Sequence, residues 1–177
     1  MGCIHIYCGD GKGKTTAAAG LAVRMAGSGG QVIIARFLKN DDSGEVSVLR
    51  EIRGIYVFPC EKDFGFTWQM SEEQKLEAGV YYGELLDKAF NMAHEVADKD
   101  KSVLLILDEV CAALNSGFLD ESQLLSFLDT RKENMEIVMT GRKPSDMMIE
   151  RADYVSEIHK IKHPFDKGTG ARRGIEY

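Results

Sequence analysis

The sequence has few of the residues that build disulfides or zinc sites. Its four cysteines include no CxxC pair, and its four histidines are scattered without an HExxH motif. Disulfide frameworks and zinc sites usually show clustered spacings of these residues. We therefore expect neither a structural nor a catalytic zinc. The free thiols of Cys3, Cys8, Cys60 and Cys111 indicate a reducing, cytoplasmic setting.

Long hydrophobic runs and an excess of positive charge are missing too. No run approaches the roughly 20 apolar residues of a membrane span, and the N-terminus has no basic stretch followed by an apolar one. The net charge is -6, whereas nucleic-acid backbones favour a basic face. We therefore expect no membrane and no nucleic acid as partners. A small anion in a local basic pocket remains compatible.

What the sequence does contain is an alternation of apolar strand-like and helical segments. The 177 residues suffice for one domain with a sizeable core. Strands are expected at residues 3–7, 31–38, 54–58, 102–110, 136–141 and 154–161, and helices at 14–27, 71–97, 120–130 and from near Pro144. Capping boxes are expected at Ser71 with Gln74 and at Asp120 with Gln123. This pattern predicts a single α/β domain over residues 1–177, with a mostly parallel central sheet and helices on both faces.

The stretch "CGDGKGKTT" follows the first expected strand and opens the first expected helix. The phosphate-binding pattern GxxxxGK[ST] fits at Gly13, Lys14 and Thr15, while its first place falls on Cys8, next to Gly9. Loop glycines let N–H groups converge on phosphate oxygens, and the helix N-terminus adds positive charge. The candidate nucleotide-binding residues are Gly9, Asp10, Gly11, Lys12, Gly13, Lys14, Thr15 and Thr16. The alternative, a flexible turn with solvated lysines, is disfavoured by the strand–loop–helix context.

A pair of acids, Asp108 and Glu109, ends the apolar run "LLILDEV". Beside a phosphate loop, acids at this place favour a Mg²⁺ site that also uses the Thr15 hydroxyl. The alternative is that the two acids cap the next helix. Glu109 also keeps hydrolysis open as a hypothesis, because an acid after the metal-binding acid can act as a general base for water.

Three further stretches lie where ligand-binding loops are expected. "DFGFTW" carries Phe66 and Trp68, which are equally compatible with a ligand site and with core anchors. "TGR" ends the fifth strand, where Arg142 is either a phosphate ligand or a surface residue. "HPFDKGTGARRGIEY" is a basic terminus whose alternative is a solvated tail.

These stretches together resemble one family. "GDGKGKTTAAAGLAVR", "FGFTW", "LDEV", "TGR", "ADYVSEI" and the terminal "HPFDKGTGARRGIEY" occur in the order and spacing of the P-loop ATP:corrinoid adenosyltransferases, and cover nearly the whole chain. The resemblance implies a RecA-like P-loop fold and a homodimer. It also implies transfer of the 5′-deoxyadenosyl group of ATP to the Co(I) centre of a corrinoid, with release of triphosphate. A reductase or flavodoxin-type protein is the expected electron donor.

The resemblance also assigns roles to residues. It implies that residues 9–15 bind the triphosphate and that Thr15 and Glu109 hold Mg²⁺, with Asp108 beside it. Phe66 and Trp68 resemble the aromatics that wall the lower face of the corrinoid. With Lys14 and Glu109 they are the expected catalytic residues. Further candidates for phosphate or corrin contacts are Arg142, Lys167, Arg172 and Arg173.

The expected chemistry needs no general base, because Co(I) is a nucleophile with no proton to lose. It needs in-line positioning and stabilisation of a charged leaving group, so the bond that breaks is C5′–O. Three alternatives stay open: a RecA-like ATPase, a small-molecule kinase, and a nucleotide-binding module without turnover. Better-known members of the family carry an N-terminal segment that helps to cover the site, whereas here the first strand is expected almost at Met1. Either another element closes the site or this chain is a shorter form.

Overall fold

The computed structural model describes residues 2–65 and 67–176 and shows a six-stranded sheet. Its strand order is β3-β2-β4-β5-β1-β6, and every paired strand is parallel. The strands are β1 (Ile4–Cys8), β2 (Gln31–Arg36), β3 (Ile55–Val57), β4 (Val103–Asp108), β5 (Met135–Thr140) and β6 (Tyr154–Glu157). The predicted α/β fold with a parallel sheet is therefore confirmed.

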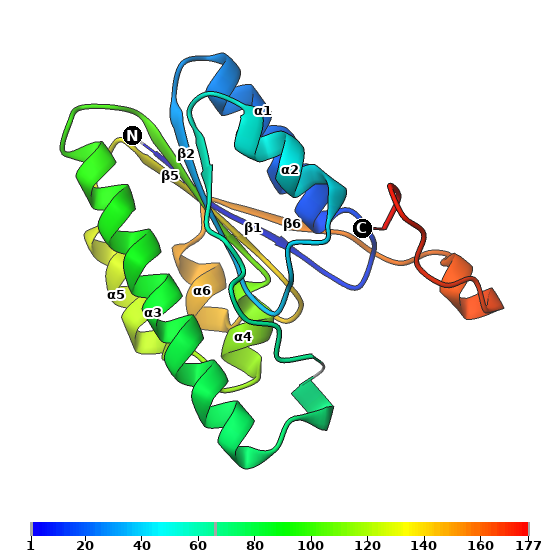
Figure 1. Ribbon diagram of the computed structural model, residues 1–177. Helices are drawn as coiled ribbons and strands as arrows, with labels where there is room; N and C mark the ends of the chain where they lie inside the picture. Colours follow the sequence, from blue (N-terminus) through cyan, green and yellow to red (C-terminus); the bar gives the residue numbers. More distant parts are fainter. Residues whose placement is uncertain (1, 66, 177) are drawn as a thin grey trace.

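Helices cover both faces of the sheet (Figure 1). One face carries α1 (Lys14–Gly27) and α2 (Gly44–Glu51). The other carries α3 (Glu72–Ala97), α4 (Val110–Asn115), α5 (Glu121–Thr130) and α6 (Asp146–Arg151). Two 3₁₀ turns lie at Thr67–Gln69 and Pro164–Lys167.

The central strand β4 separates two apolar cores. Leu104 and Ile106 pack in the core beneath α1 and α2, whereas Leu105 and Leu107 pack in the core beneath α3 to α6. All six residues of β4 are buried, as expected for a parallel strand covered on both faces. The strand therefore holds its last residue, Asp108, in a fixed position inside the protein.

Two helices were not predicted, and several expected strands end earlier in the structure. Helix α2 has only 8 residues and buries only Val46 and Leu49, so it offers too few apolar positions for a helical period to be recognised. Helix α4 begins directly after Glu109, within the expected strand 102–110, because the chain turns sharply there. Sharp turns of this kind depend on backbone angles that apolar patterning does not reveal.

The two predicted capping boxes had different outcomes. At α3 the box is confirmed, since Gln74 N–H donates to Ser71 Oγ and Ser71 N–H donates to the Gln74 side chain. At α5 the prediction is wrong: Asp120 accepts from the N–H of Ser122, and the Gln123 side chain donates to Asp87 on α3 instead. A partner on a neighbouring helix competes with the local cap, which sequence spacing cannot show.

Parallel pairing brings the carboxyl ends of all six strands to one edge of the sheet. The phosphate loop follows β1, residues 37–43 follow β2, and Glu109 follows β4. The segment after β6 runs outward and then returns its end to the start of α1 (Figure 1). The phosphate loop, the two acids and Arg142 therefore gather at this edge.

Candidate active site

The phosphate loop between β1 and α1 is held by the segment that follows β6. Gly11 N–H donates to the carbonyl oxygen of Ile158 at 2.7 Å, and the Asp10 carboxylate accepts from Lys160 N–H at 2.9 Å. Gly9 has φ 100°, and a Cβ there would lie 2.4 Å from the Ile158 carbonyl oxygen. Only glycine therefore fits at this position. The neighbouring Cys8 is the buried last residue of β1, one residue beyond the expected end of that strand.

Lys14 places a cation at the centre of the loop. Its side chain is largely buried, and its ammonium donates to the carbonyl oxygens of Gly9 and Gly11, both at 2.9 Å. The loop surrounds a cavity of about 240 Å³, which Glu109 and Arg142 also line. The structure thus brings Arg142, from the end of β5, to the same cavity as the loop lysines. This arrangement is suited to a polyanion.

A buried polar cluster lies below the start of α1. Asp108, which is 1% exposed, accepts from Thr15 Oγ1 at 3.0 Å and from Thr140 Oγ1 at 2.6 Å. The ammonium of Lys39 pairs with the same carboxylate and donates to Thr15 Oγ1 at 2.8 Å. Lys39 comes from the segment after β2 and was missed in the sequence. Its position three residues beyond a parallel strand was the available signal.

Glu109 lies between Asp108 and helix α4. Its φ of 61° is unusual for a residue other than glycine, and its N–H donates to Thr140 Oγ1 at 2.9 Å. Burial raises the pKa of Glu109, and the nearby Lys39 opposes that rise. The strained turn directs the Glu109 carboxylate to the cavity of the phosphate loop instead of continuing the strand.

The oxygens of this cluster fit Mg²⁺ better than a softer metal. Thr15, Asp108 and Glu109 offer a hydroxyl and two carboxylates, and Mg²⁺ commonly uses one or two carboxylates together with substrate phosphates. Among the described residues, no group of three or more His, Cys, Asp or Glu could hold a metal ion by itself. A metal ion here would therefore need oxygen ligands from a bound phosphate chain in addition to those of the protein.

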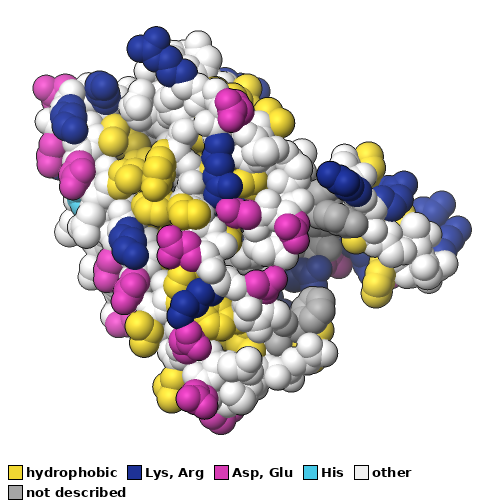
Figure 2. Space-filling view, in the orientation of Figure 1, with side chains coloured by type: hydrophobic (Ala, Val, Ile, Leu, Met, Phe, Trp, Pro, Cys, Tyr) yellow, Lys and Arg dark blue, Asp and Glu magenta, His cyan; other side chains and the backbone are white. Residues whose placement is uncertain are grey.

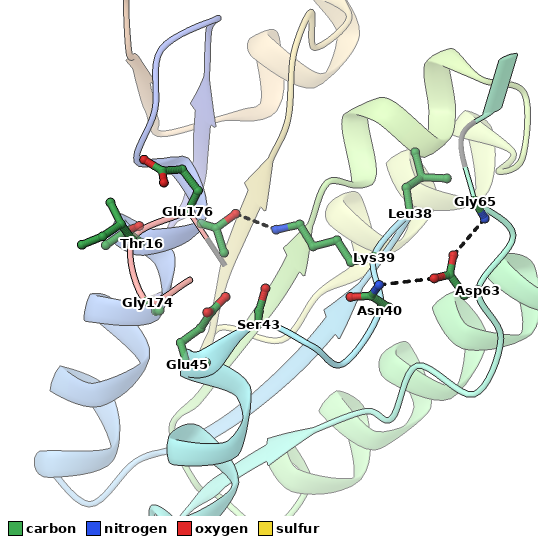
Figure 3. A pocket seen from close by; sticks show the side chains of 14 residues that line it. Thr16, Leu38, Lys39, Asn40, Ser43, Glu45, Asp63, Gly65, Gly174 and Glu176 are labelled. Atoms are coloured by element: carbon green, nitrogen blue, oxygen red, sulfur yellow. Dashed lines mark hydrogen bonds between the residues drawn. The ribbon is translucent and has the colours of Figure 1, made fainter. Parts of the chain in front are cut away.

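A second, larger cavity of about 660 Å³ adjoins the phosphate loop (Figure 3). Thr15 and Thr16 line both cavities. In Figure 3, Lys39 extends from the segment after β2 towards α1, and the start of α2 contributes Glu45. Further lining residues come from three segments that are distant in sequence: Leu38, Asn40, Ser43, Asp63, Gly65, Gly174 and Glu176. Of these segments, the sequence indicated only the aromatic loop and the basic terminus.

The aromatic loop is only partly placed at this site. Asp63 and Gly65 line the larger cavity, and Phe66 lies outside the described residues. Trp68 is 76% exposed in the turn Thr67–Gln69, so the interpretation of Trp68 as a core anchor is wrong. Trp68 lines neither of the two cavities.

The basic terminus contributes unequally. Figure 2 shows Lys and Arg side chains gathered on the projecting C-terminal segment. Lys167 and Arg173 are exposed and line neither cavity at the loop. Arg172 lines a further cavity together with Lys12. It pairs with the Glu176 carboxylate at 3.0 Å, so a phosphate would compete with Glu176 for it. The last residues of the terminus, Ile175 and Glu176, therefore line the cavity of the phosphate loop, whereas Lys167, Arg172 and Arg173 do not.

The Arg172–Glu176 pair leads to a prediction on pH. Hydrogen bonds from Arg172 lower the pKa of Glu176 from 4.5 to about 2. The pair therefore forms fully above the ordinary carboxyl pKa and is lost as the pH falls towards 2. Between pH 5 and pH 3, measured by carboxyl NMR, we expect Glu176 to stay ionised in the wild type. In Arg172→Met the pKa of Glu176 should rise towards 4.5, although the backbone N–H of residue 172 still donates to the carboxylate. Equal titration in both proteins would show that the pair does not form.

The four cysteines are free of disulfides, as predicted. In the described part of the chain, no helix has the length and apolar character needed to span a membrane.

A glycine loop joins the parallel strand β1 to α1 and carries a lysine at its centre, and an acid ends β4, which β5 separates from β1. This arrangement defines a P-loop nucleotide-binding protein. Solved structures agree on the fold. A structure of EssC ATPases 2 and 3 from Geobacillus thermodenitrificans has a TM-score of 0.55 at 16% identity, over 91% of this chain and 32% of that one. The cytoplasmic domain of EssC gives 0.55 at 17% identity, over 97% and 34%. This chain spans about a third of these structures.

The chain belongs to the ATP:corrinoid adenosyltransferase family. The family model described as "ATP:corrinoid adenosyltransferase BtuR/CobO/CobP" matches residues 1–177. Corrinoid adenosyltransferases from Pseudomonas aeruginosa and Escherichia coli K12 are each 33% identical over 99% of this chain, covering 84% and 86% of their own lengths. One from Sinorhizobium is 31% identical over 99% of this chain and 80% of its own length. The protein is thus an enzyme that transfers an adenosyl group from ATP to a corrinoid.

Proposed function

We propose that residues 9–15 hold the triphosphate of ATP as the leaving group of this transfer. The observation that carries the proposal is the convergence of Lys14 and Arg142 on the small cavity, next to the Thr15–Asp108 pair. The adenosine then occupies the larger cavity, because Thr15 and Thr16 line both. The C5′–O bond accordingly lies between the two cavities. On this proposal, residues 1–177 act as one adenosyltransferase domain.

Bond breakage at C5′ explains why a phosphate loop serves a reaction that cleaves no phosphoanhydride bond. The electron pair of Co(I) forms the bond to C5′, and the C5′–O electrons leave with the triphosphate. Lys14 and Arg142 stabilise the negative charge of that leaving group in a site whose donors are already in place. No proton is transferred in this step, so Glu109 serves as a metal ligand and not as a base.

We propose that Thr15, Asp108 and Glu109 hold Mg²⁺ together with the phosphate chain. The metal ion would neutralise charge on the triphosphate. The donor set supports this assignment, since hydroxyl and carboxylate oxygens suit a hard divalent cation. Asp108 is buried and fixed by Thr140, so its position changes little when the ligand set changes.

Other properties implied by the family remain proposals for this chain. We propose a cytoplasmic homodimer that acts on a corrinoid reduced to Co(I) by a reductase or flavodoxin-type donor. The free thiols support the reducing compartment. Phe66 and Trp68 would wall the corrinoid, and the exposure of Trp68 supports a role in contacting a ligand.

Trp68 can be tested through the oxidation state of the corrinoid. Trp68→Ala should slow the reaction that starts from Co(II) about tenfold more than the reaction that starts from preformed Co(I). The reason is that the wall favours the reducible state, and tenfold corresponds to about 1.4 kcal/mol. Trp68→Phe, which keeps an aromatic face, should retain most of the Co(II) rate. Equal losses in the two assays would argue that Trp68 has only a structural role.

The reaction itself is tested by anaerobic incubation with MgATP and chemically reduced cob(I)alamin. The corrin spectrum and the phosphate product are followed together. Adenosylcobalamin with triphosphate is expected. ADP without a cobalt–carbon product would instead indicate that the protein hydrolyses ATP or transfers a phosphoryl group.

A further inference from the structure

Lys39 occupies an unexpected position for a loop lysine. Its ammonium pairs with Asp108 and donates to Thr15 Oγ1. The side chain of Asp108 is 2% exposed and that of Lys39 is 24% exposed. Lys39 is therefore the counter-ion of a buried carboxylate, and it binds two of the oxygens that the proposed metal ion would use.

The backbone around Lys39 is fixed from both sides. Leu38 before it has φ 54°, and the carbonyl of Asn40 after it accepts from Arg36 Nη1 at 2.9 Å. The Asn40 side chain in turn donates to Asp63 Oδ2 at 3.3 Å (Figure 3). Because the loop is held at these points, a change in the position of the ammonium is made by the side chain alone.

The buried guanidinium of Arg36 is the main anchor of this loop. Arg36 is 4% exposed and pairs with Asp41, and its Nε has no hydrogen-bond partner among the described residues. The loop therefore retains a costly buried charge, which keeps Lys39 opposite the start of α1.

Two cations cannot share the Thr15 and Asp108 oxygens. Mg²⁺ requires oxygen ligands at short range in a nearly octahedral arrangement, and an ammonium on the same lone pairs opposes it by charge and by volume. The ammonium would then need new acceptors within the length of its own side chain. Lys39 lines the larger cavity together with Thr15 and Thr16. If ATP binds as proposed, the nearest anionic partners of the ammonium are the phosphate oxygens at the nucleoside end of the triphosphate.

We propose that Lys39 is an exchangeable counter-ion. It neutralises Asp108 until the divalent metal ion does so, and it then binds the phosphate chain next to the C5′–O bond. This role rests on the proposed binding of the triphosphate at the loop. It makes Lys39 a second phosphate-binding lysine, on a different element from Lys14, at the oxygen that leaves.

Two binding measurements on the full chain test this role without using activity. The first titrates Mn²⁺ into the protein alone, and the second titrates tripolyphosphate in the presence of Mg²⁺. Lys39→Met should bind Mn²⁺ about tenfold more tightly, because the competing ammonium is gone. It should bind tripolyphosphate about tenfold more weakly, the effect of one charged hydrogen bond. Lys39→Arg should keep the tripolyphosphate affinity within about threefold, because the cation is retained.

Controls separate this role from the proposed site as a whole. Lys62→Met removes a lysine that pairs with exposed Glu77 and lines neither cavity, so both affinities should stay at wild-type values. Circular dichroism verifies that each variant is folded. If Lys14→Met loses tripolyphosphate binding while Lys39→Met keeps both affinities unchanged, the role of Lys39 is wrong and the phosphate site stands. If the wild type itself binds no tripolyphosphate, the proposed site is wrong.

Discussion

Lys14→Met is expected to lower kcat for adenosyl transfer by about 100- to 1,000-fold, the usual loss when one preorganised electrostatic donor is removed. The reason is the position of the Lys14 ammonium, which lies at the centre of the loop and lines the small cavity. Methionine keeps most of the hydrocarbon stem, so the packing at this buried position changes little. The expected loss is therefore one of charge.

The measurement is anaerobic turnover with MgATP and preformed Co(I), with circular dichroism as the test of folding. Lys62→Met serves as the matched control, since it removes an ammonium outside both cavities. Near-normal adenosyl transfer by a folded Lys14→Met protein would show that the phosphate loop does not take part in catalysis.

Asp108→Asn should lower the free energy of unfolding by about 2–3 kcal/mol, below the 3–5 kcal/mol typical of a fully buried pair because Lys39 is partly exposed. The asparagine oxygen can still accept a hydrogen bond from Thr140, but the ammonium of Lys39 loses its counter-ion. For a chain of this size we expect a fall in Tm of about 4–12 °C. Thermal unfolding without added divalent cations measures it.

The double variant Asp108→Asn with Lys39→Met shows whether the two charges act together. Removing both leaves no uncompensated charge, so the double variant should recover at least half of the stability that Asp108→Asn loses. If the two single effects simply add, the pair does not contribute to stability as a pair, and the destabilisation arises from the Thr15 and Thr140 hydrogen bonds.

The sequence predicted the parts of this site that depend on local pattern. A β-type run, a glycine loop and a helix-forming run placed Lys14 and Thr15 at the start of α1. A continuous apolar run ending in two acids placed Asp108 at the end of a buried strand. Both follow because strand and helix periodicities, with parallel pairing, determine where such residues come together.

The parts that it did not predict depend on backbone turns and on contacts distant in sequence. Lys39 reaches Asp108 because Leu38 has a positive φ and because Arg36 donates a hydrogen bond to the carbonyl of Asn40, which fixes the loop after Lys39. The turn at Glu109 has the same character, since its positive φ ends β4 two residues before the expected end. Neither angle leaves a signature in the pattern of apolar residues.

The hydrogen bonds between the phosphate loop and the segment after β6 have a consequence for local unfolding. All four residues of β6 are exposed, and the strand lies at the end of the sheet, so it belongs to the part of the fold that opens most readily. When the following segment detaches, Gly11 N–H loses the Ile158 carbonyl and Asp10 loses the N–H of Lys160. The loop then loses its shape while both cores remain packed. Amide hydrogen exchange in the phosphate loop should consequently be as fast as exchange in the edge strand β6. The local opening that inactivates the enzyme therefore costs less free energy than global unfolding.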